Sequence, residues 1–169
     1  MKVDEKNELE LYINSRDEMI ELGKKIGEFA YPNLVITLDG DLGAGKTTFT
    51  KGIALGLGIN SIVSSPTFTI MKIYEGRLTL YHMDVYRIND PFSDFELEEY
   101  FELDGVCVIE WAENIKELLP DDLLNISIQD LGEDKRKLKI FSETIELMPS
   151  PSAIPLVKVV LPADRKSVV

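Results

Sequence analysis

The sequence predicts a single α/β domain with a mostly parallel central sheet, antiparallel hairpins added to that sheet, and helices on both of its faces. Three observations lead to this fold class. Residues 34–38 are an apolar and β-branched run, which is typical of a strand buried in a parallel sheet. A glycine-rich loop follows this run, and an amphipathic helix follows the loop. Later in the chain, two pairs of apolar segments are each joined by a short polar turn, which predicts the hairpins.

The glycine-rich loop at residues 40–47 matches G-x-x-x-x-G-K-[ST], the phosphate-binding loop of P-loop NTPases. Glycine lets the backbone approach an anion closely because it has no Cβ and adopts positive φ. Successive N–H groups then point toward the phosphate oxygens. In this motif Lys46 lies near the β- and γ-phosphates, and the hydroxyl of Thr47 is a ligand of Mg²⁺. The other loop residues that we expect around the phosphates are Asp41, Leu42, Gly43, Ala44 and Gly45.

The elements that flank this loop follow from residue spacing and helix caps. Residues 9–13 alternate between apolar and polar, which predicts an edge strand. Ser15 is a helix N-cap with Glu18 in capping-box position, and the apolar spacing predicts a helix that ends near Ala30. After the loop, apolar residues at helical spacing predict a second helix that stops at Gly58. The dipole at the N-terminus of this second helix favours a bound phosphate.

Strands and short helices alternate in the middle of the chain. Residues 68–74 and 78–86 predict a hairpin at a sheet edge, and residues 92–100 predict a short acidic helix with Ser93 as its cap. A buried strand over residues 106–109 comes next. It contains the only cysteine, which we interpret as a buried strand residue and which excludes an internal disulfide.

The last third of the chain predicts a short helix, a second hairpin and a tail. The helix covers residues 114–119, and the hairpin strands cover residues 124–128 and 137–141. We expect one domain over residues 1–145. The proline-rich tail at residues 146–169 does not favour helix, and the sequence leaves its order open.

Composition limits where the protein acts. The chain has 169 residues, of which 44% are hydrophobic, enough for one domain with an ordinary core. No apolar run approaches the roughly 20 residues that a membrane-spanning helix needs, and the charged N-terminus lacks the apolar stretch of a signal peptide. We therefore expect a cytoplasmic protein that does not associate with membranes.

The chain is strongly acidic, with a formal net charge of −12. This charge opposes non-specific binding to RNA, DNA or an anionic membrane, because neutralising phosphates requires a basic surface. Between Arg87 and Lys116 there are nine acidic residues and no Lys or Arg. This segment is either a solvated acidic surface or a docking face for a basic protein surface.

A carboxylate that holds the metal is the second requirement for nucleotide hydrolysis. Asp84, near the end of the strand predicted over residues 78–86, is the candidate, acting directly or through a water molecule. Because side chains alternate along a strand, it shares a face with His82 and Tyr86. The alternative is a half-solvated edge strand. We interpret His82, the only histidine, as a structural hydrogen-bonding residue rather than as a general base.

Two further segments supply polar side chains at strand ends and in loops. Glu110 ends the buried strand, and ligands of open α/β sheets gather at the carboxyl ends of strands. It is a candidate to hold a metal-bound water or to orient the nucleophile, with a capping or ion-pair role as the alternative. Trp111 lies either in the core or against the nucleotide. The hydroxyls of Ser65 and Thr67 belong either to a loop that orders on the γ-phosphate or to a simple turn.

Four motifs in this order resemble the bacterial TsaE (YjeE) family of ATPases, which serve tRNA threonylcarbamoyladenosine biosynthesis. They are GDLGAGKTT in the phosphate loop, SPTF at residues 65–68, HMDVYR at residues 82–87 and IEWAE at residues 109–113. Many families share the phosphate loop, whereas the ordered set of four motifs is far more specific. The resemblance runs from about Leu9 to Phe141, and the tail has no counterpart in it.

The resemblance implies a compact ATPase that uses ATP and Mg²⁺. We also expect slow turnover, because no arginine is clearly placed as a finger, and a monomer or weak self-association. Its partners are TsaD and TsaB, which form N6-threonylcarbamoyladenosine at position 37 of tRNA, so that it acts on tRNA only indirectly. Lys46, Asp84 and Glu110 are implied to be catalytic, with Thr47, Asp84 and Glu110 on the metal side. Thr48, Thr67 and Trp111 are implied to contact the nucleotide. Arg87 is the nearest arginine for a finger on the γ-phosphate, unless a partner supplies one.

The main alternative is a small-molecule or nucleoside kinase that uses the same phosphate loop. Such kinases usually close an arginine-bearing lid over the transferred phosphate. The absence of any basic residue at positions 88–115 counts against this alternative. A GTP-dependent switch is a further alternative, but the chain has neither the N-K-x-D motif of guanine recognition nor a D-x-x-G motif.

Overall fold

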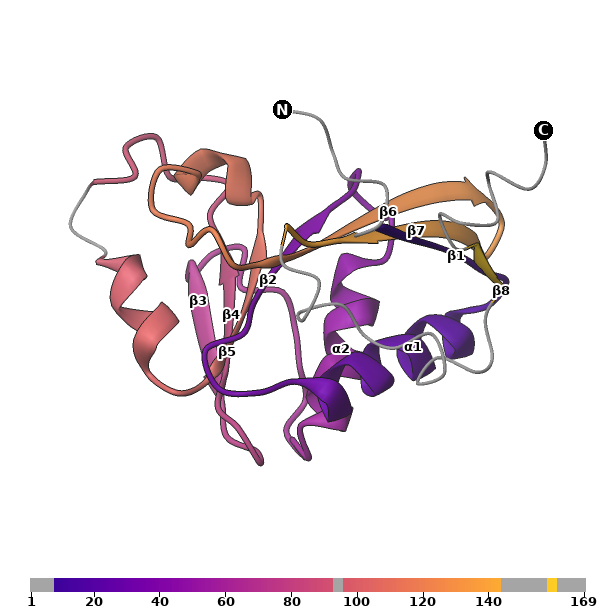
Figure 1. The fold of residues 1–169 in the computed structure, drawn as a ribbon, viewed down its shortest axis with the longest axis horizontal. Helices are drawn as coiled ribbons and strands as arrows, with labels where there is room; N and C mark the ends of the chain where they lie inside the picture. The colour runs from indigo at the N-terminus through magenta and orange to yellow at the C-terminus, as the bar shows by residue number, and fades with distance from the viewer. Residues whose placement is uncertain (1–7, 93–95, 144–157, 161–169) are drawn as a thin grey trace.

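The computed structural model describes residues 8–92 and 96–143 and the backbone of residues 158–160. In this part of the chain the strands form one eight-stranded mixed sheet in the order β3-β4-β5-β2-β6-β7-β1-β8 (Figure 1). The elements are β1 (Glu8–Ile13), α1 (Arg16–Phe29), β2 (Val35–Asp39), α2 (Lys46–Gly56), β3 (Met71–Tyr74), β4 (Leu80–Asp84), the 3-10 helix η2 (Leu97–Glu102), β5 (Val106–Glu110), the 3-10 helix η3 (Ala112–Ile115), β6 (Leu124–Gly132), β7 (Lys135–Phe141) and β8 (Lys158–Val160).

The sheet is parallel at its centre and antiparallel at both sides, as the sequence predicts. Strands β4, β5, β2 and β6 are parallel neighbours, with β3 added antiparallel at one side and β7, β1 and β8 at the other. Strands β2, β4 and β5 are buried on both faces, whereas β6 alternates between buried and partly exposed residues. Their carboxyl ends meet at one edge, where α2 begins after β2. The predicted fold class is confirmed.

Different kinds of helix cover the two faces. Both α-helices pack on one face, where Ile36 and Leu38 of β2 join their core cluster. Val35 points to the opposite face and belongs to a second cluster with side chains of η2 and η3. The helices predicted on this second face are therefore short 3-10 segments, and Figure 1 shows them on the side of the sheet away from α1 and α2. Among the described residues, no helix is long and apolar enough to cross a bilayer.

Two pairs of glycines set the distance between α1 and α2. Gly23 and Gly27 of α1 face Gly52 and Gly56 of α2 at the point where the helices touch. A Cβ on Gly52 would lie 2.9 Å from the Cα of Gly23 and closer still to the carbonyl oxygen of Ile20. The contact between the two helices leaves no space for a Cβ, so only glycine permits the backbones to approach this closely. This contact fixes the helix that carries the phosphate loop against the rest of the domain.

We expect Gly52→Ala to destabilise the protein by about 2–3 kcal/mol, although alanine favours helix over glycine by about 1 kcal/mol. The added methyl group has to push apart two backbones rather than a flexible side chain. Urea unfolding followed by circular dichroism measures the difference. Leu55→Ala is the control, because this α2 side chain is 53% exposed. Equal stability of Gly52→Ala and the wild type would show that the helices separate without cost.

Most predicted elements are present with shifted ends. Ser15 caps α1, its Oγ accepting a hydrogen bond from the Glu18 N–H at 3.1 Å. The helix predicted over residues 92–100 is a 3-10 helix over Leu97–Glu102, and its predicted cap, Ser93, lies outside the described residues. The helix predicted over residues 114–119 is the 3-10 helix Ala112–Ile115. They have six and four residues, and residue spacing does not locate the ends of so short a helix.

Two predictions concern the margins of the sheet and its core. The strand β1 is not at the edge, because β8 pairs with it over Glu10–Tyr12. The strand β8 lies in the predicted tail, beyond residue 145. The domain boundary at residue 145 stays a prediction. Cys107 is buried as predicted, and burial raises the pKa of its thiol to about 12, which excludes a reactive thiolate near neutral pH.

Candidate functional site

The loop between β2 and α2 is shaped for a bound anion. Gly43 and Gly45 adopt φ values of 82° and 115°, in the region that side chains other than glycine rarely enter. Gly45 is the N-cap of α2 and supplies no capping side chain. The first N–H groups of α2 therefore lack a side-chain acceptor at the positive end of the helix dipole. An anion with several oxygens satisfies them.

Lys46 stands at the mouth of a pocket. Its ammonium group donates to the carbonyl oxygen of Gly40 at 2.8 Å and lies 4.6 Å from the ring centroid of Trp111. The lysine is only 7% exposed, so its charge is largely desolvated. The pocket has a volume of about 420 Å³, within the range of small-molecule sites. Its lining residues are Leu38, Asp39, Gly40, Asp41, Lys46, Trp111 and Glu113.

Trp111 lines this pocket and also packs against the second core cluster, and its contact with a nucleotide stays a prediction. It has a φ of 62°, a strained conformation for an aromatic residue. This conformation turns the chain directly after β5, and the ring comes to lie between Lys46 and Tyr86, whose ring centroid is 4.8 Å away. The side chain amide of Asn114 holds the turn by donating to the carbonyl oxygens of Val85 and Tyr86 at 3.0 and 3.1 Å.

Two carboxylates meet at the ends of neighbouring strands. Asp84 ends β4 and Glu110 ends β5, and the two residues are register partners in the parallel pair. Neighbouring strands lie about 4.8 Å apart, so the side chains are adjacent on the face that α1 and α2 cover. Asp84 is 7% exposed and Glu110 is 4% exposed. The half-solvated strand considered as an alternative is thereby excluded, since every residue of β4 is buried.

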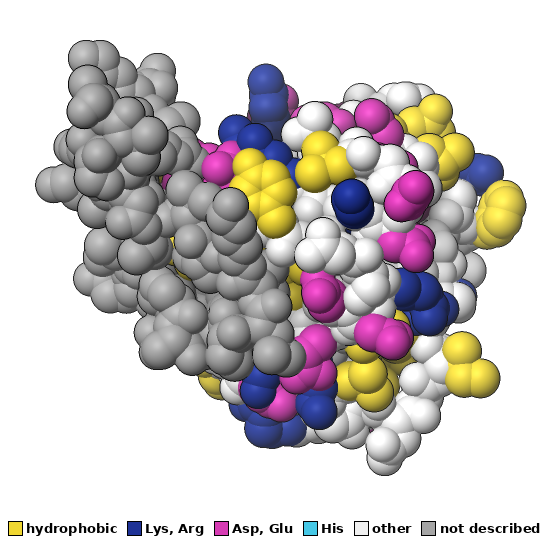
Figure 2. Space-filling view, turned by 90° about the vertical axis from the view of Figure 1, so that its right-hand side faces the viewer, with side chains coloured by type: hydrophobic (Ala, Val, Ile, Leu, Met, Phe, Trp, Pro, Cys, Tyr) yellow, Lys and Arg dark blue, Asp and Glu magenta, His cyan; other side chains and the backbone are white. Residues whose placement is uncertain are grey.

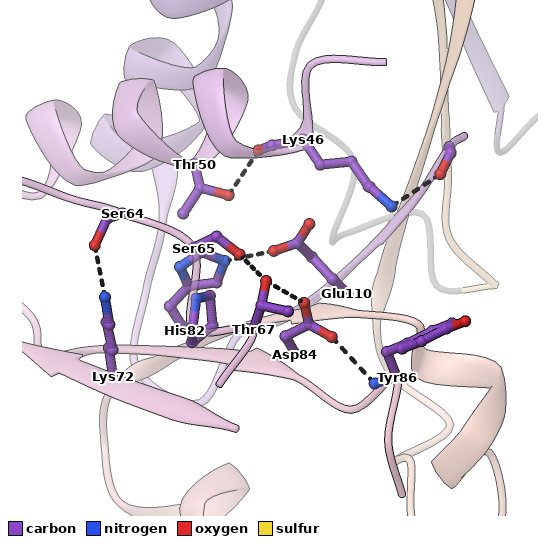
Figure 3. A network of polar contacts seen from close by, with 12 residues as sticks. Lys46, Thr50, Ser64, Ser65, Thr67, Lys72, His82, Asp84, Tyr86 and Glu110 are labelled. Carbon is purple, nitrogen blue, oxygen red and sulfur yellow. Dashed lines mark hydrogen bonds and ion pairs between the residues drawn. The ribbon is translucent and has the colours of Figure 1, made fainter. Parts of the chain in front are cut away.

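Hydrogen bonds hold each carboxylate in place (Figure 3). The backbone N–H of Tyr86 donates to Asp84 Oδ1 at 3.1 Å, and the Thr67 hydroxyl donates to Oδ2 at 3.4 Å. The hydroxyl groups of Ser65 and Thr67 are 2.6 Å apart, which links the loop after α2 to Asp84. The imidazole Nε2 of His82 lies 2.9 Å from Glu110 Oε2. The structure thus brings together the second, third and fourth sequence motifs.

The carboxylate pair fits a magnesium ion. Among the described residues no group of three or more His, Cys, Asp or Glu side chains forms a complete metal cage. Mg²⁺ is commonly held by one or two carboxylates together with phosphate oxygens and water. Asp84 and Glu110, with the Thr47 hydroxyl at the start of α2, are donors of this kind. A cation there also offsets the repulsion between two buried negative charges.

Arg136, on β7, contacts the phosphate loop and was missed by the sequence analysis. Its Nε donates to the carbonyl oxygen of Ala44 at 2.8 Å, and its Nη1 donates to Asp130 Oδ1 at 3.0 Å. In a trans peptide the N–H points opposite to the C=O. Because Arg136 draws the Ala44 carbonyl toward β7, the following N–H of Gly45 points away from β7. No sequence motif marks this contact, since the two residues are 92 positions apart.

The remaining predicted residues differ in whether they lie at this loop. Thr48 and three glycine-loop residues line a smaller pocket of about 130 Å³ between the loop, α1 and Arg136. The Leu42 side chain is 96% exposed, so this residue contributes only its backbone to the loop. Arg87 stacks over the ring of Phe68 at 5.0 Å. Figure 2 shows acidic and basic side chains interspersed on the described part of one face, without a continuous basic patch.

Comparisons with known proteins agree with the four motifs. The family model described as "Threonylcarbamoyl adenosine biosynthesis protein TsaE" matches residues 13–138. The protein of this name from Bacillus subtilis is 55% identical over 123 residues, which cover 72% of this chain and 78% of that protein. The protein of this name from Treponema pallidum is 43% identical over 128 residues, covering 75% of this chain and 95% of the relative.

A solved structure shows that the similarity extends to the fold. The crystal structure of YdiB from Bacillus subtilis superposes with a TM-score of 0.75 at 44% sequence identity, covering 87% of this chain and 91% of YdiB. Residues 13–138, which the family model matches, include the phosphate loop, both carboxylates and Trp111. With a family match across most of the domain and relatives of this identity and coverage, the chain belongs to the TsaE family.

Proposed function

We propose that the protein is a Mg²⁺-dependent ATPase that supports formation of N6-threonylcarbamoyladenosine at position 37 of tRNA, together with TsaD and TsaB. The observation that carries the proposal is the meeting of three parts at one sheet edge. These are the glycine-rich loop with Lys46, the buried pair of Asp84 and Glu110, and the hydroxyl loop that contacts Asp84. Membership in the TsaE family supports the tRNA process.

Each part has a distinct role in the proposed reaction. The loop amides and Lys46 bind the phosphates, and Lys46 exchanges the Gly40 carbonyl for phosphate oxygens. Thr47 and Asp84 would hold Mg²⁺, and the ion would offset the negative charge that develops on the phosphates. Glu110 orients the attacking water or a water on the metal. Thr67 is hydrogen-bonded to Asp84, and its loop becomes ordered on the γ-phosphate when that phosphate is present.

The proposed partners hold the tRNA, and this chain contacts it only through them. Its net charge of −12 opposes direct binding to RNA phosphates. It also favours the approach of a basic protein surface, which electrostatic steering accelerates. Slow turnover of the isolated protein fits the position of Arg87, which stacks on Phe68 instead of lying among the residues of the phosphate pocket.

Hydrolysis of ATP with and without Mg²⁺ tests the proposal. We expect Mg²⁺-dependent phosphate release that increases when TsaD, TsaB and tRNA are added. Trp111, the only tryptophan, provides a binding signal, because a bound nucleotide displaces the Lys46 ammonium from its ring. Phosphate transfer to a metabolite or nucleoside faster than to water would overturn the proposal in favour of the kinase. Binding without hydrolysis, even with both partners present, would leave only a nucleotide-dependent interaction module.

A further inference from the structure

We infer that His82 is a positioning residue that holds the Glu110 carboxylate in the orientation required for hydrolysis. This inference rests on the proposed function, in which Glu110 orients a water molecule. It adds that His82 fixes the Glu110 side chain for that role. His82 is entirely buried, and its Nε2 lies 2.9 Å from Glu110 Oε2. The two residues come from adjacent parallel strands, β4 and β5, and they are 28 positions apart in the chain.

The hydrogen-bonding state of the pair follows from its partners. A carboxylate only accepts hydrogen bonds, so Nε2 of His82 carries the proton and donates to Glu110. The second ring nitrogen, Nδ1, is buried and has no partner among the described residues. A buried polar atom without a partner costs stability, and an apolar residue of similar size would avoid this cost at Nδ1 but would remove the donor to Glu110. The contact with Glu110 is therefore the reason for a histidine at this position.

The consequence for Glu110 is a restricted carboxyl group. One oxygen, Oε2, is held by His82, which fixes the plane of the group and leaves Oε1 available. Figure 3 shows the imidazole and the carboxyl group facing each other across the two strands, with Asp84 beside them. A hydrogen bond to one carboxylate oxygen therefore orients the other oxygen. In the same way, hydrogen-bond partners orient side chains that bind a metal ion. His82 itself is not among the residues that line the pocket beside Lys46.

Two substitutions of His82 separate positioning from packing. In His82→Gln the side-chain amide nitrogen lies near the place of Nε2 and still donates to Glu110. In His82→Asn it lies near Nδ1 and does not reach. We expect His82→Asn to lower kcat by about 10- to 100-fold, with KM for ATP and nucleotide affinity changed less than about threefold. We expect His82→Gln to recover at least a third of the wild-type kcat.

A double-mutant cycle gives a test that does not depend on the glutamine variant folding well. In a Glu110→Gln background, which has already lost the carboxylate, His82→Asn should change kcat by less than about twofold. A full additive loss in that background would assign His82 a packing role and overturn the inference. Equal kcat for His82→Asn and the wild type, in proteins with the same melting temperature, would overturn it as well.

Nuclear magnetic resonance tests the contact without any hydrolysis. Since the chain has one histidine, all imidazole nitrogen signals belong to His82, and only Nδ1 and Nε2 have to be distinguished. We expect a protonated Nε2 whose proton is shifted downfield by the carboxylate and moves upfield in Glu110→Gln. An unprotonated Nε2, or a signal unaffected by Glu110→Gln, would refute the contact. If the wild type fails to hydrolyse ATP with both partners present, the proposed function fails, and this spectrum still reports on the contact.

Discussion

Replacing Lys46 by alanine is expected to weaken ATP binding roughly 10- to 100-fold. Hydrogen bonds of a charged group contribute about 1.5–3 kcal/mol, and each 1.4 kcal/mol changes affinity about tenfold. Lys46 is 7% exposed and lines the pocket of about 420 Å³. In the alanine variant, water therefore compensates poorly for the lost ammonium group. Isothermal titration calorimetry with ATP and Mg²⁺ measures the loss. We also expect nucleotide-dependent assembly with TsaD and TsaB to disappear in this variant.

Lys51→Ala is the matched control for this experiment. Lys51 lies on the same helix, one and a half turns beyond the phosphate loop, and lines none of the pockets around that loop. The Lys51→Ala substitution removes one positive charge, as Lys46→Ala does, so a general electrostatic effect would appear in both variants. If both substitutions weakened ATP binding equally, Lys46 would have no specific part in holding the phosphates. If neither did, the nucleotide would not bind in this loop.

Asp84→Asn is expected to lower kcat about 100-fold while leaving ATP affinity within about fivefold of the wild type. Removing one group that stabilises developing charge in a transition state typically lowers kcat by about 10²–10³-fold. The asparagine keeps the shape of the side chain and an oxygen acceptor for the Tyr86 N–H. It loses the charge that holds Mg²⁺ in the proposed site. Single-turnover hydrolysis and nucleotide titration over a range of Mg²⁺ concentrations separate the two effects.

A shifted magnesium dependence distinguishes a metal ligand from a structural residue. We expect Asp84→Asn to need more Mg²⁺ for half-maximal activity, because a neutral amide binds the cation more weakly. Asp121→Asn, an exposed site away from the phosphate loop, should change neither quantity. Equal losses of ATP affinity and of kcat, accompanied by a lower melting temperature, would show that Asp84 serves only the fold.

The position of Arg87 bears on both predictions. From the sequence it is the nearest arginine for a finger on the γ-phosphate, but its guanidinium group stacks on Phe68, whose side chain is 84% exposed. An arginine finger contributes about 10³- to 10⁵-fold to kcat in related chemistry. Without one, the isolated protein is expected to be slow. The exposed Phe68 belongs to the same loop as Thr67, so a partner that covers it also reaches the loop bonded to Asp84.

Several features of the fold were predictable because their causes are local. The cap of α1 depends on Ser15 and Glu18, three residues apart, and the phosphate loop depends on eight consecutive residues. Alternating side chains placed His82 and Asp84 on one face of β4. The 3-10 helices were placed imprecisely, since four to six residues are too few for apolar spacing to mark where a helix begins or ends.

The sequence by itself determined the phosphate loop, the buried strands before and after it and the two acidic residues at strand ends, because these depend on neighbours in the chain. The tertiary structure alone decided that Glu110 meets His82, that Arg136 holds the Ala44 carbonyl, and that Lys46 lies on Trp111. It also decided that four glycines bring α1 and α2 into backbone contact. These contacts depend on strand order and helix packing, which place residues 28 to 92 positions apart side by side.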